Sequence, residues 1–392
     1  MRAVIGANYG DEGKGRTVDW LAAPLAGAPG PEAVVVRSNG GAQAGHTVAI
    51  EGRRHVFHHF GSGTLRGVRT HLSRFMVSHP ILFAEERSAL AGLGAAPLVT
   101  ADPRGWVTTP WDMMVNQALE QARGGGRHGS CGLGLGETVG RCEETPFGLA
   151  VGDLGGDGLA SALQAVRDEW LPRRCAALGL DPGAGPLAQA RAEPVLARFF
   201  AECRAFADAV TPCADGGVAA LGAPIFEAAQ GLLLDQNALG FPHVTRANTG
   251  LANMVAIAQD AGIDRLDAFY VSRCYLTRHG RGPMEDERAI DAFYAVDDPT
   301  NRPNTWQETL RFGLLSPARL GARIAADVAA AAERLTVRPS IALTCLDQAR
   351  DGRFAWLDEE GEVRTGPAAA LVAAVETASG LAVTAQFRGA AN

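Results

Sequence analysis

The segment NYGDEGKGRTVDW (residues 8–20) decides the fold, because it joins two elements of different periodicity through a glycine-rich turn. The apolar run MRAVIGA (1–7) before it is typical of a short buried strand. Beyond the glycines of this turn, Val18, Leu21 and Leu25 have the spacing of one helix face. Glycines in a strand–turn–helix unit let the backbone approach an anion, and the helix N-terminus attracts negative charge. The segment therefore predicts a phosphate-binding turn.

The turn holds Lys14, which is the only lysine among 36 basic residues. Arginine can replace most surface lysines, but its planar guanidinium does not fit a site that needs a compact ammonium. We infer that Lys14 is chemically constrained. The segment departs from the common pattern G-x-x-x-x-G-K-[ST], because Arg16 follows Gly15. The alternative interpretation is an ordinary turn between strand and helix, with a solvated cluster of Asp11, Glu12 and Lys14.

A second strand, EAVVVRSN (32–39), also ends in a glycine-rich turn, NGGAQAGHTV (39–48), which carries His46. The turns that follow parallel strands lie at the carboxyl edge of the sheet, where ligands bind. We therefore expect Asp11 and His46 to face one cleft. A lone histidine is more often structural than catalytic, but its place between Gly45 and Thr47 at a strand end favours catalysis.

The remaining pattern predicts an α/β protein with a mainly parallel central sheet flanked by helices, in one large domain over residues 1–392. Further strands are expected at 55–60, 74–78, 97–100, 224–228, 267–275 and 339–346, and long helices at about 159–179, 192–211 and 316–335. The most glycine-rich stretch, 122–141, is too long for a plain turn and is interpreted as a functional loop.

Composition narrows the class of protein further. The net charge of −7 argues against general binding to nucleic acid or an anionic membrane. No apolar run approaches the roughly 20 residues that span a bilayer, and the N-terminus does not resemble a signal peptide. The seven cysteines form no C-x-x-C pair, which disfavours a zinc cluster and favours free thiols. We expect a cytoplasmic protein.

Six segments resemble, in the right order, the motifs of the adenylosuccinate synthetase family. The pattern G-D-E-G-K-G-K resembles GDEGKGR (10–16), and G-G-x-N-A-G-H-T resembles GGAQAGHT (40–47). The other matching segments are HHFGSGTL (58–65), FEAAQGLLLDQNALGFPHVTRANT (226–249), YLTRHGRGPM (275–284) and ALTCLD (342–347). The resemblance runs from residue 2 to about 347 and identifies the chain as a divergent member of the family.

The resemblance implies the P-loop-NTPase-like fold of the family and a homodimeric ligase that condenses IMP with L-aspartate, using GTP and Mg²⁺. Asp11 would take the N1 proton of the purine, so that the 6-oxygen attacks the γ-phosphate. Lys14 would hold phosphate oxygens, and His46 would stabilise charge at the bridging position. The amine of aspartate would then displace phosphate. Asp11 and the carbonyl of Gly45 would bind the metal.

The resemblance also implies a set of binding residues. Contacts with the triphosphate or its base are expected from Gly10, Glu12, Gly13, Gly15, Arg16, Gly45, Thr47 and Asp347. Contacts with the other substrates are expected from Gln43, Ser130, Cys131, Arg141, Gln230, Thr245, Thr300 and Arg302. Arg141 corresponds to the arginine that reaches across the dimer interface in the family.

Departures from the family motifs leave several alternatives open. Gln43 stands for asparagine and Cys131 for threonine. Cys345 replaces the lysine of the base-reading turn, and AQFRG replaces the family's G-P-x-R segment near the end, so ATP competes with GTP as the energy donor. The substrate is IMP or a close 6-oxopurine nucleotide. A divergent phage branch acts on dGMP and replaces the catalytic aspartate, whereas Asp11 is present here. The remaining alternatives are a paralogue of specialised metabolism, a ligase that activates a carboxylate, and a nucleotide-binding regulator without catalysis.

Overall fold

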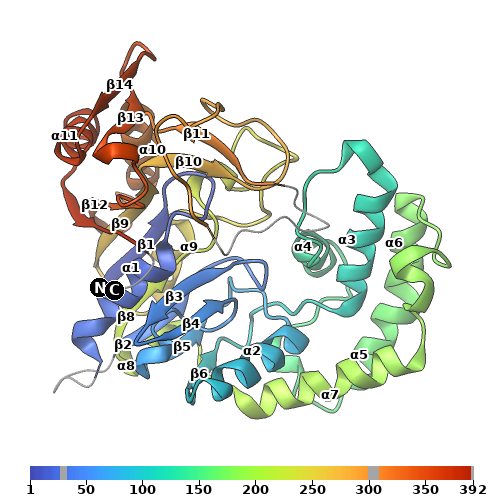
Figure 1. Cartoon of the computed structure of the whole chain (residues 1–392). Coiled ribbons are helices and arrows are strands. Elements are labelled where there is room, and N and C mark those ends of the chain that lie inside the picture. The colour runs from blue at the N-terminus through green and yellow to red at the C-terminus, as the bar shows by residue number, and fades with distance from the viewer. Residues whose placement is uncertain (27–32, 299–308, 390–392) are drawn as a thin grey trace.

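The computed structural model describes residues 1–26, 33–298 and 309–389. Within these residues the central sheet has nine strands in the order β15-β12-β9-β1-β8-β2-β5-β6-β7, and each neighbouring pair is parallel (Figure 1). The strands are β1 (Arg2–Gly6), β2 (Ala33–Arg37), β5 (Arg69–Leu72), β6 (Val99–Ala101), β7 (Thr211–Pro212), β8 (Ala223–Glu227), β9 (Arg265–Arg273), β12 (Thr336–Thr344) and β15 (Val383–Gln386). The parallel sheet confirms the predicted fold class.

The helices form three groups around this sheet (Figure 1). One face is covered by α1 (Lys14–Ala22), and the other by α8 (Val218–Leu221), α9 (Ala252–Asp260), α10 (Pro317–Ala331) and α11 (Ala368–Ser379). A helical arm beside the sheet contains α2 (Pro80–Gly92), α3 (Pro110–Arg123), α4 (Leu135–Glu144), α5 (Leu159–Ala165), α6 (Leu171–Leu178) and α7 (Glu193–Ala209). None of the helices in these ranges has the length and hydropathy needed to cross a bilayer.

Side chains of the central strands alternate between two cores, because successive residues of a strand point to opposite faces. In β1, Ala3 and Ile5 join the core beneath α9 and α10. Val4 joins the opposite core, where it meets Val18 and Leu21 of α1. The apolar spacing that predicted α1 is therefore the face that holds this helix on the sheet, with its N-terminus at the carboxyl end of β1.

Three antiparallel hairpins lie outside the central sheet. They pair β3 (His46–Ile50) with β4 (Arg53–Phe57), β10 (Tyr275–Arg278) with β11 (Arg311–Leu314), and β13 (Phe354–Leu357) with β14 (Val363–Gly366). The strand expected at 55–60 is thus β4, in a hairpin. His46 begins β3, directly after the second glycine-rich turn, so the first hairpin fixes where this side chain emerges.

Two expectations from the sequence were wrong in detail. Residues 74–78 form no strand: the strand is β5, and the chain then turns, with Met76 N–H donating to the Ser73 carbonyl at 3.0 Å. The buried side chains of Met76 and Val77 explain the strand-like apolar pattern. The stretch 122–141 is only partly a loop, since its last residues belong to α4.

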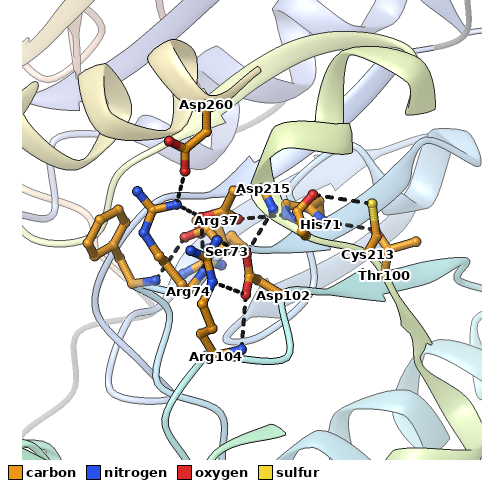
Figure 2. Close-up of polar contacts among 12 residues, drawn as sticks. Arg37, His71, Ser73, Arg74, Thr100, Asp102, Arg104, Cys213, Asp215 and Asp260 are labelled. Carbon is orange, nitrogen blue, oxygen red and sulfur yellow. Dashed lines mark hydrogen bonds and ion pairs between the residues drawn. The ribbon is translucent and has the colours of Figure 1, made fainter. Parts of the chain in front are cut away.

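A buried polar network ties the carboxyl ends of β5 and β6 to α9 (Figure 2). The Asp215 carboxylate lies 2.9 Å from His71 Nε2 and 2.8 Å from Arg74 Nη1, which also contacts Asp260 at 2.6 Å. His71 Nδ1 lies 3.0 Å from Thr100 Oγ1. His71 and Asp215 are fully buried, and both ring nitrogens are occupied. We interpret this network as structural.

Replacing Asp215 with alanine should therefore be strongly destabilising, because His71 and Arg74 would lose their shared acceptor in a buried place. We expect the free energy of unfolding to fall by about 3–5 kcal/mol. Urea denaturation monitored by circular dichroism measures the loss. Asp157→Ala, at an exposed loop position, is the matched control and should change little. Equal losses in the two variants would contradict the assigned role of Asp215.

His79 makes stability depend on pH. Its Nδ1 accepts from Leu82 N–H at the start of α2 (3.4 Å), its Nε2 lies 2.7 Å from Met113 Sδ, and burial lowers its pKa to about 3. The folded state therefore keeps His79 neutral while the unfolded state takes up a proton below pH 6.5. Stability is fully present above that pH and is lost as pH falls toward 3.

Between pH 7.5 and 5.5, we expect the wild type to lose about 1.4 kcal/mol more unfolding free energy than His79→Gln, which removes this titrating group. Urea denaturation of both proteins at the two pH values provides the comparison. Identical pH dependence in the two proteins would show that His79 remains protonatable in the fold.

Candidate functional site

The turn after β1 is organised around a buried ion pair. Lys14 Nζ lies 2.8 Å from Glu12 Oε2, and the side chains are 3 % and 2 % exposed. Glu12 Oε1 accepts N–H groups from Asn8 and Gly10 at 3.0 and 2.8 Å. Gly10 and Gly13 have φ values of 92° and 97°, which glycine adopts without strain. Glu12 and Lys14 are therefore buried rather than solvated, which differs from the cluster expected in the alternative interpretation, whereas Asp11 remains partly exposed.

Neighbouring backbone leaves little room around this ion pair. A Cβ on Gly6, the last residue of β1, would lie 2.5 Å from Glu12 Oε2 and 2.8 Å from Lys14 Nζ. A Cβ on Gly231, beyond the end of β8, would lie 2.7 Å from Glu12 Oε1. The site accommodates an ammonium but not the wider guanidinium, which gives the chemical constraint on Lys14 a geometric cause.

His46, at the second turn, is held by a carboxylate that sequence reasoning did not assign. Its Nδ1 lies 2.6 Å from Glu227 Oε1, at the carboxyl end of β8. Ser62 donates its backbone N–H to Glu227 Oε2 at 3.1 Å and its hydroxyl to Oε1. Glu227 lies in the matched segment FEAAQG at a strand end, which was the signal available. The carboxylate fixes the orientation of the imidazole ring.

Burial determines the charge states of this pair. It lowers the pKa of His46, whose ring is 5 % exposed, and the neutral imidazole therefore donates Nδ1–H to the carboxylate. Burial alone would raise the pKa of Glu227, but His46, Arg37 and Ser62 together lower it to about 2. His46 thus presents Nε2 away from Glu227, and this nitrogen makes no hydrogen bond to the described residues.

The two glycine-rich turns are in contact, as the sequence predicts. A Cβ on Gly15, in the first turn of α1, would lie 2.9 Å from His46 Cβ and 3.1 Å from Ser62 Oγ. In the second turn Gln43 Nε2 is buried without a partner in the described chain. The adjacent Gly45 is exposed, and Thr47 is half-buried. The structure therefore places the turn that carries Lys14 against the turn that carries Gln43 and His46.

Asp11 completes this site from the first turn. It has a φ of 59°, and its side chain is 29 % exposed. Its carbonyl accepts from Arg273 Nε at 2.5 Å, and its Oδ2 lies 3.3 Å from His279 Nε2. Gln230 Oε1 would lie 3.6 Å from a Cβ on Gly10, so Gln230 borders the same turn. His279 belongs to the matched segment TRHGRGP, but sequence reasoning did not select it.

Arg16 and Asp347 lie on the side of α1 toward β12 and β15. Arg16 donates to the carbonyls of Arg388 (3.1 Å) and Gly389, and its guanidinium lies 4.9 Å from the Phe387 ring centroid. Burial lowers its pKa, while the charge of Asp347 opposes this shift. Asp347 is exposed in the turn after β12.

The predicted phosphate contacts at the far end of the site are spread over two loops. Ser130 donates to Asn116 Oδ1 at 2.8 Å, and burial raises the pKa of the Cys131 thiol. Thr245 is half-buried, with its N–H bonded to the Leu234 carbonyl. The loops meet through His243 Nδ1, which lies 3.0 Å from the His128 carbonyl oxygen. Thr300 and Arg302 lie outside the described residues.

The structure does not bring Arg141 to this site. Its guanidinium is fully buried between α3 and α4 and contacts both oxygens of Asp112, at 2.9 and 2.8 Å. It also donates to the carbonyls of Phe147 and Val107. These four donor contacts hold Arg141 within the helical arm as a structural residue. The geometry gives no support to the expected contact between Arg141 and a nucleotide phosphate.

A family model described as adenylosuccinate synthetase matches residues 3–301. The chain is 32 % identical over 298 residues to the adenylosuccinate synthetase of Myxococcus xanthus (strain DK1622), covering 72 % of this chain and 65 % of that protein. It is 31 % identical over 331 residues to that of Anaeromyxobacter dehalogenans (strain 2CP-C), covering 78 % and 72 %. The chain belongs to the adenylosuccinate synthetase family, although the match spans just under two thirds of the first relative.

Two solved structures share the fold over the whole chain. Fully ligated adenylosuccinate synthetase from Plasmodium falciparum has a TM-score of 0.73 at 17 % identity, covering 100 % of this chain and 98 % of that one. Cyanophage S-2L succinoaminodeoxyadenylate synthetase, bound to dGMP and dATP as an energy donor, has a TM-score of 0.63 at 16 % identity, covering 100 % and 93 %. The predicted fold is thereby confirmed.

The crowding around Nζ predicts that Lys14→Arg is nearly as damaging as Lys14→Ala. The guanidinium would have to displace Glu12 or the backbone beyond β8, whereas alanine simply removes the charge. We expect nucleotide-dependent phosphate release to fall by about 10²-fold or more in both variants, as for loss of one charged contact to the transition state. Near-normal turnover by Lys14→Arg would contradict the argument.

Proposed function

We propose that this protein is a ligase that joins IMP to L-aspartate with hydrolysis of GTP, forming adenylosuccinate. The observation that carries the proposal is the contact between the two glycine-rich turns, one of which carries Asp11 and Lys14 and the other His46. Membership of the family supports the same activity.

The geometry supports a role for each of these groups. Asp11 is partly exposed in the turn that Gln230 borders, so its carboxylate would accept the N1 proton of a purine whose edge contacts the Gln230 amide. The deprotonated purine then attacks the γ-phosphorus through its 6-oxygen. Lys14 would share its charge between Glu12 and phosphate oxygens, and His46 Nε2, on a ring held by Glu227, would face the bridging oxygen.

The residues present fit a magnesium ion. The described chain has no group of three or more His, Cys, Asp or Glu side chains that could bind a metal, so the site beside Asp11 has few protein ligands. The Asp11 carboxylate and the exposed Gly45 carbonyl are oxygen donors, and Mg²⁺ commonly takes few protein ligands beside phosphate oxygens. When bound, the ion would neutralise charge on those phosphate oxygens. Asp11 and Gly45 would hold it between the two turns.

The energy donor and the assembly belong to the same proposal. The exposed carboxylate of Asp347 supports GTP, because it can accept from the N1 and N2 donors of guanine, as carboxylates do elsewhere. ATP is the second candidate, because Cys345 stands in this turn where the family has a lysine. We propose a homodimer because the family is homodimeric, although Arg141 does not supply the expected contact across its interface.

A second substrate, dGMP, is favoured by one observation, namely the fold shared with the cyanophage protein that binds dGMP. IMP remains the first candidate because Asp11 is retained and positioned at the turn. The two substrates differ only at C2 of the base and in the sugar. Both are 6-oxopurine nucleotides, and both would use the same phosphoryl transfer to the 6-oxygen.

The test is turnover by the purified protein with Mg²⁺, L-aspartate and each pairing of IMP or dGMP with GTP or ATP. Phosphate release and the absorbance of the product are followed together. We expect release to require all three substrates and to fall by about 10²–10⁴-fold in Asp11→Asn, which keeps the size of the side chain but removes the base. Nucleotide binding without turnover for any pairing would favour the regulator instead.

A further inference from the structure

His279 is the one side chain of the described residues in polar contact with the Asp11 carboxylate, with Nε2 3.3 Å from Oδ2. The side chains of the two residues are 16 % and 29 % exposed, so this contact lies at the edge of the site. A carboxylate with so few partners can adopt several rotamers, because nothing else in the described chain restrains its oxygens. A catalytic base works best when its orientation is fixed before substrate arrives.

The backbone around His279 is anchored to the same turn that carries Asp11. The Arg278 guanidinium lies 4.7 Å from the centroid of the Tyr9 ring, and the Tyr9 hydroxyl accepts from Glu285 N–H at 2.9 Å. Arg278 also donates to the carbonyls of Pro283 and His243, at 2.6 and 2.7 Å. These contacts clamp the segment 278–285 against Tyr9. The position of the backbone that carries His279 is therefore set by the fold.

The other ring nitrogen indicates which tautomer is present. Nδ1 of His279 is buried and has no hydrogen-bond partner in the described chain. A buried N–H without a partner is rarer in folded proteins than a buried acceptor without one. If the ring holds a single proton, the unpartnered Nδ1 places that proton on Nε2, the nitrogen that faces Asp11. An ionised carboxylate can only accept, so the two groups are complementary.

We propose that His279 is a positioning residue that holds the Asp11 carboxylate through Nε2–H, so that Oδ2 is restrained and Oδ1 faces the purine. The inference rests on the proposed function, in which Asp11 receives the N1 proton. In that step the proton passes to Oδ1, the bond between O6 and the γ-phosphorus forms, and the bond from that phosphorus to the β–γ bridging oxygen breaks. His279 touches neither the purine nor the phosphate in this assignment.

Positional isotope exchange separates this step from binding and from the later attack of aspartate. GTP labelled with ¹⁸O at the β–γ bridge is incubated with IMP and Mg²⁺ without aspartate. Reversible transfer of the γ-phosphoryl group to the 6-oxygen scrambles the label into the β-phosphate. We expect His279→Leu to slow scrambling and kcat by about 10–100-fold, as for loss of a group that orients a functional ligand. The KM values for IMP and GTP should change by less than about threefold.

Two further variants distinguish positioning from a merely structural role. His279→Gln keeps an N–H donor of similar reach and should restore most of the scrambling rate. In the double variant Asp11→Asn/His279→Leu, the loss should not exceed that of Asp11→Asn alone, because His279 acts through the carboxylate. Thermal unfolding checks that each variant is folded.

The outcomes separate the two proposals. Wild-type rates of scrambling in His279→Leu, or losses that multiply in the double variant, would overturn the role of His279 and leave the ligase intact. A wild-type protein that scrambles no label with IMP or dGMP, while binding GTP, would contradict the ligase and with it the role of His279.

Discussion

The ion pair between Lys14 and Glu12 fixes the shape of the turn on which the rest of the site depends. In a turn whose N–H groups converge, an anion is the natural occupant, and here the Glu12 carboxylate accepts N–H groups from Asn8 and Gly10. The turn is thus preorganised by its own side chain. Gly6 and Gly231 are part of the same constraint, because a side chain at either position would displace the carboxylate.

Much of the fold could be predicted because its central strands are buried on both faces and therefore appear as continuous apolar runs. The strands around residues 2–7, 32–39 and 267–275 are clear examples. The strand prediction from apolar residues failed where buried residues do not form a strand. Met76 is buried in the turn that follows β5, and the buried Val77 forms only an isolated bridge to Gly41, so the apolar residues alone suggested a longer strand. Periodicity reports burial, whereas a strand also needs a neighbour to pair with.

A residue of the candidate site could be predicted from the sequence where its position depends on residues nearby in the chain. Asp11, Lys14 and His46 lie in turns whose glycines and flanking elements are local, and the structure brings these turns together. Glu227 and His279 reach the site from strands and loops far along the chain, so only tertiary packing selects them. Arg141 shows the converse, because the family resemblance implied a ligand contact while Asp112, 29 residues earlier, holds it in the helical arm.

On the far side of the site, the loops around residues 129 and 280 meet through two glycines, and the Arg281 side chain also donates to the Gly125 carbonyl. A Cβ on Gly129 would lie 2.7 Å from Arg281 N, and one on Gly280 would lie 3.0 Å from the Gly129 carbonyl oxygen; both residues have positive φ. Two segments about 150 positions apart thus share one van der Waals surface, and neither glycine can gain a side chain unless the other loop retreats. A change in substrate range that alters the contact between these two loops is therefore expected to evolve through paired substitutions, one in each loop.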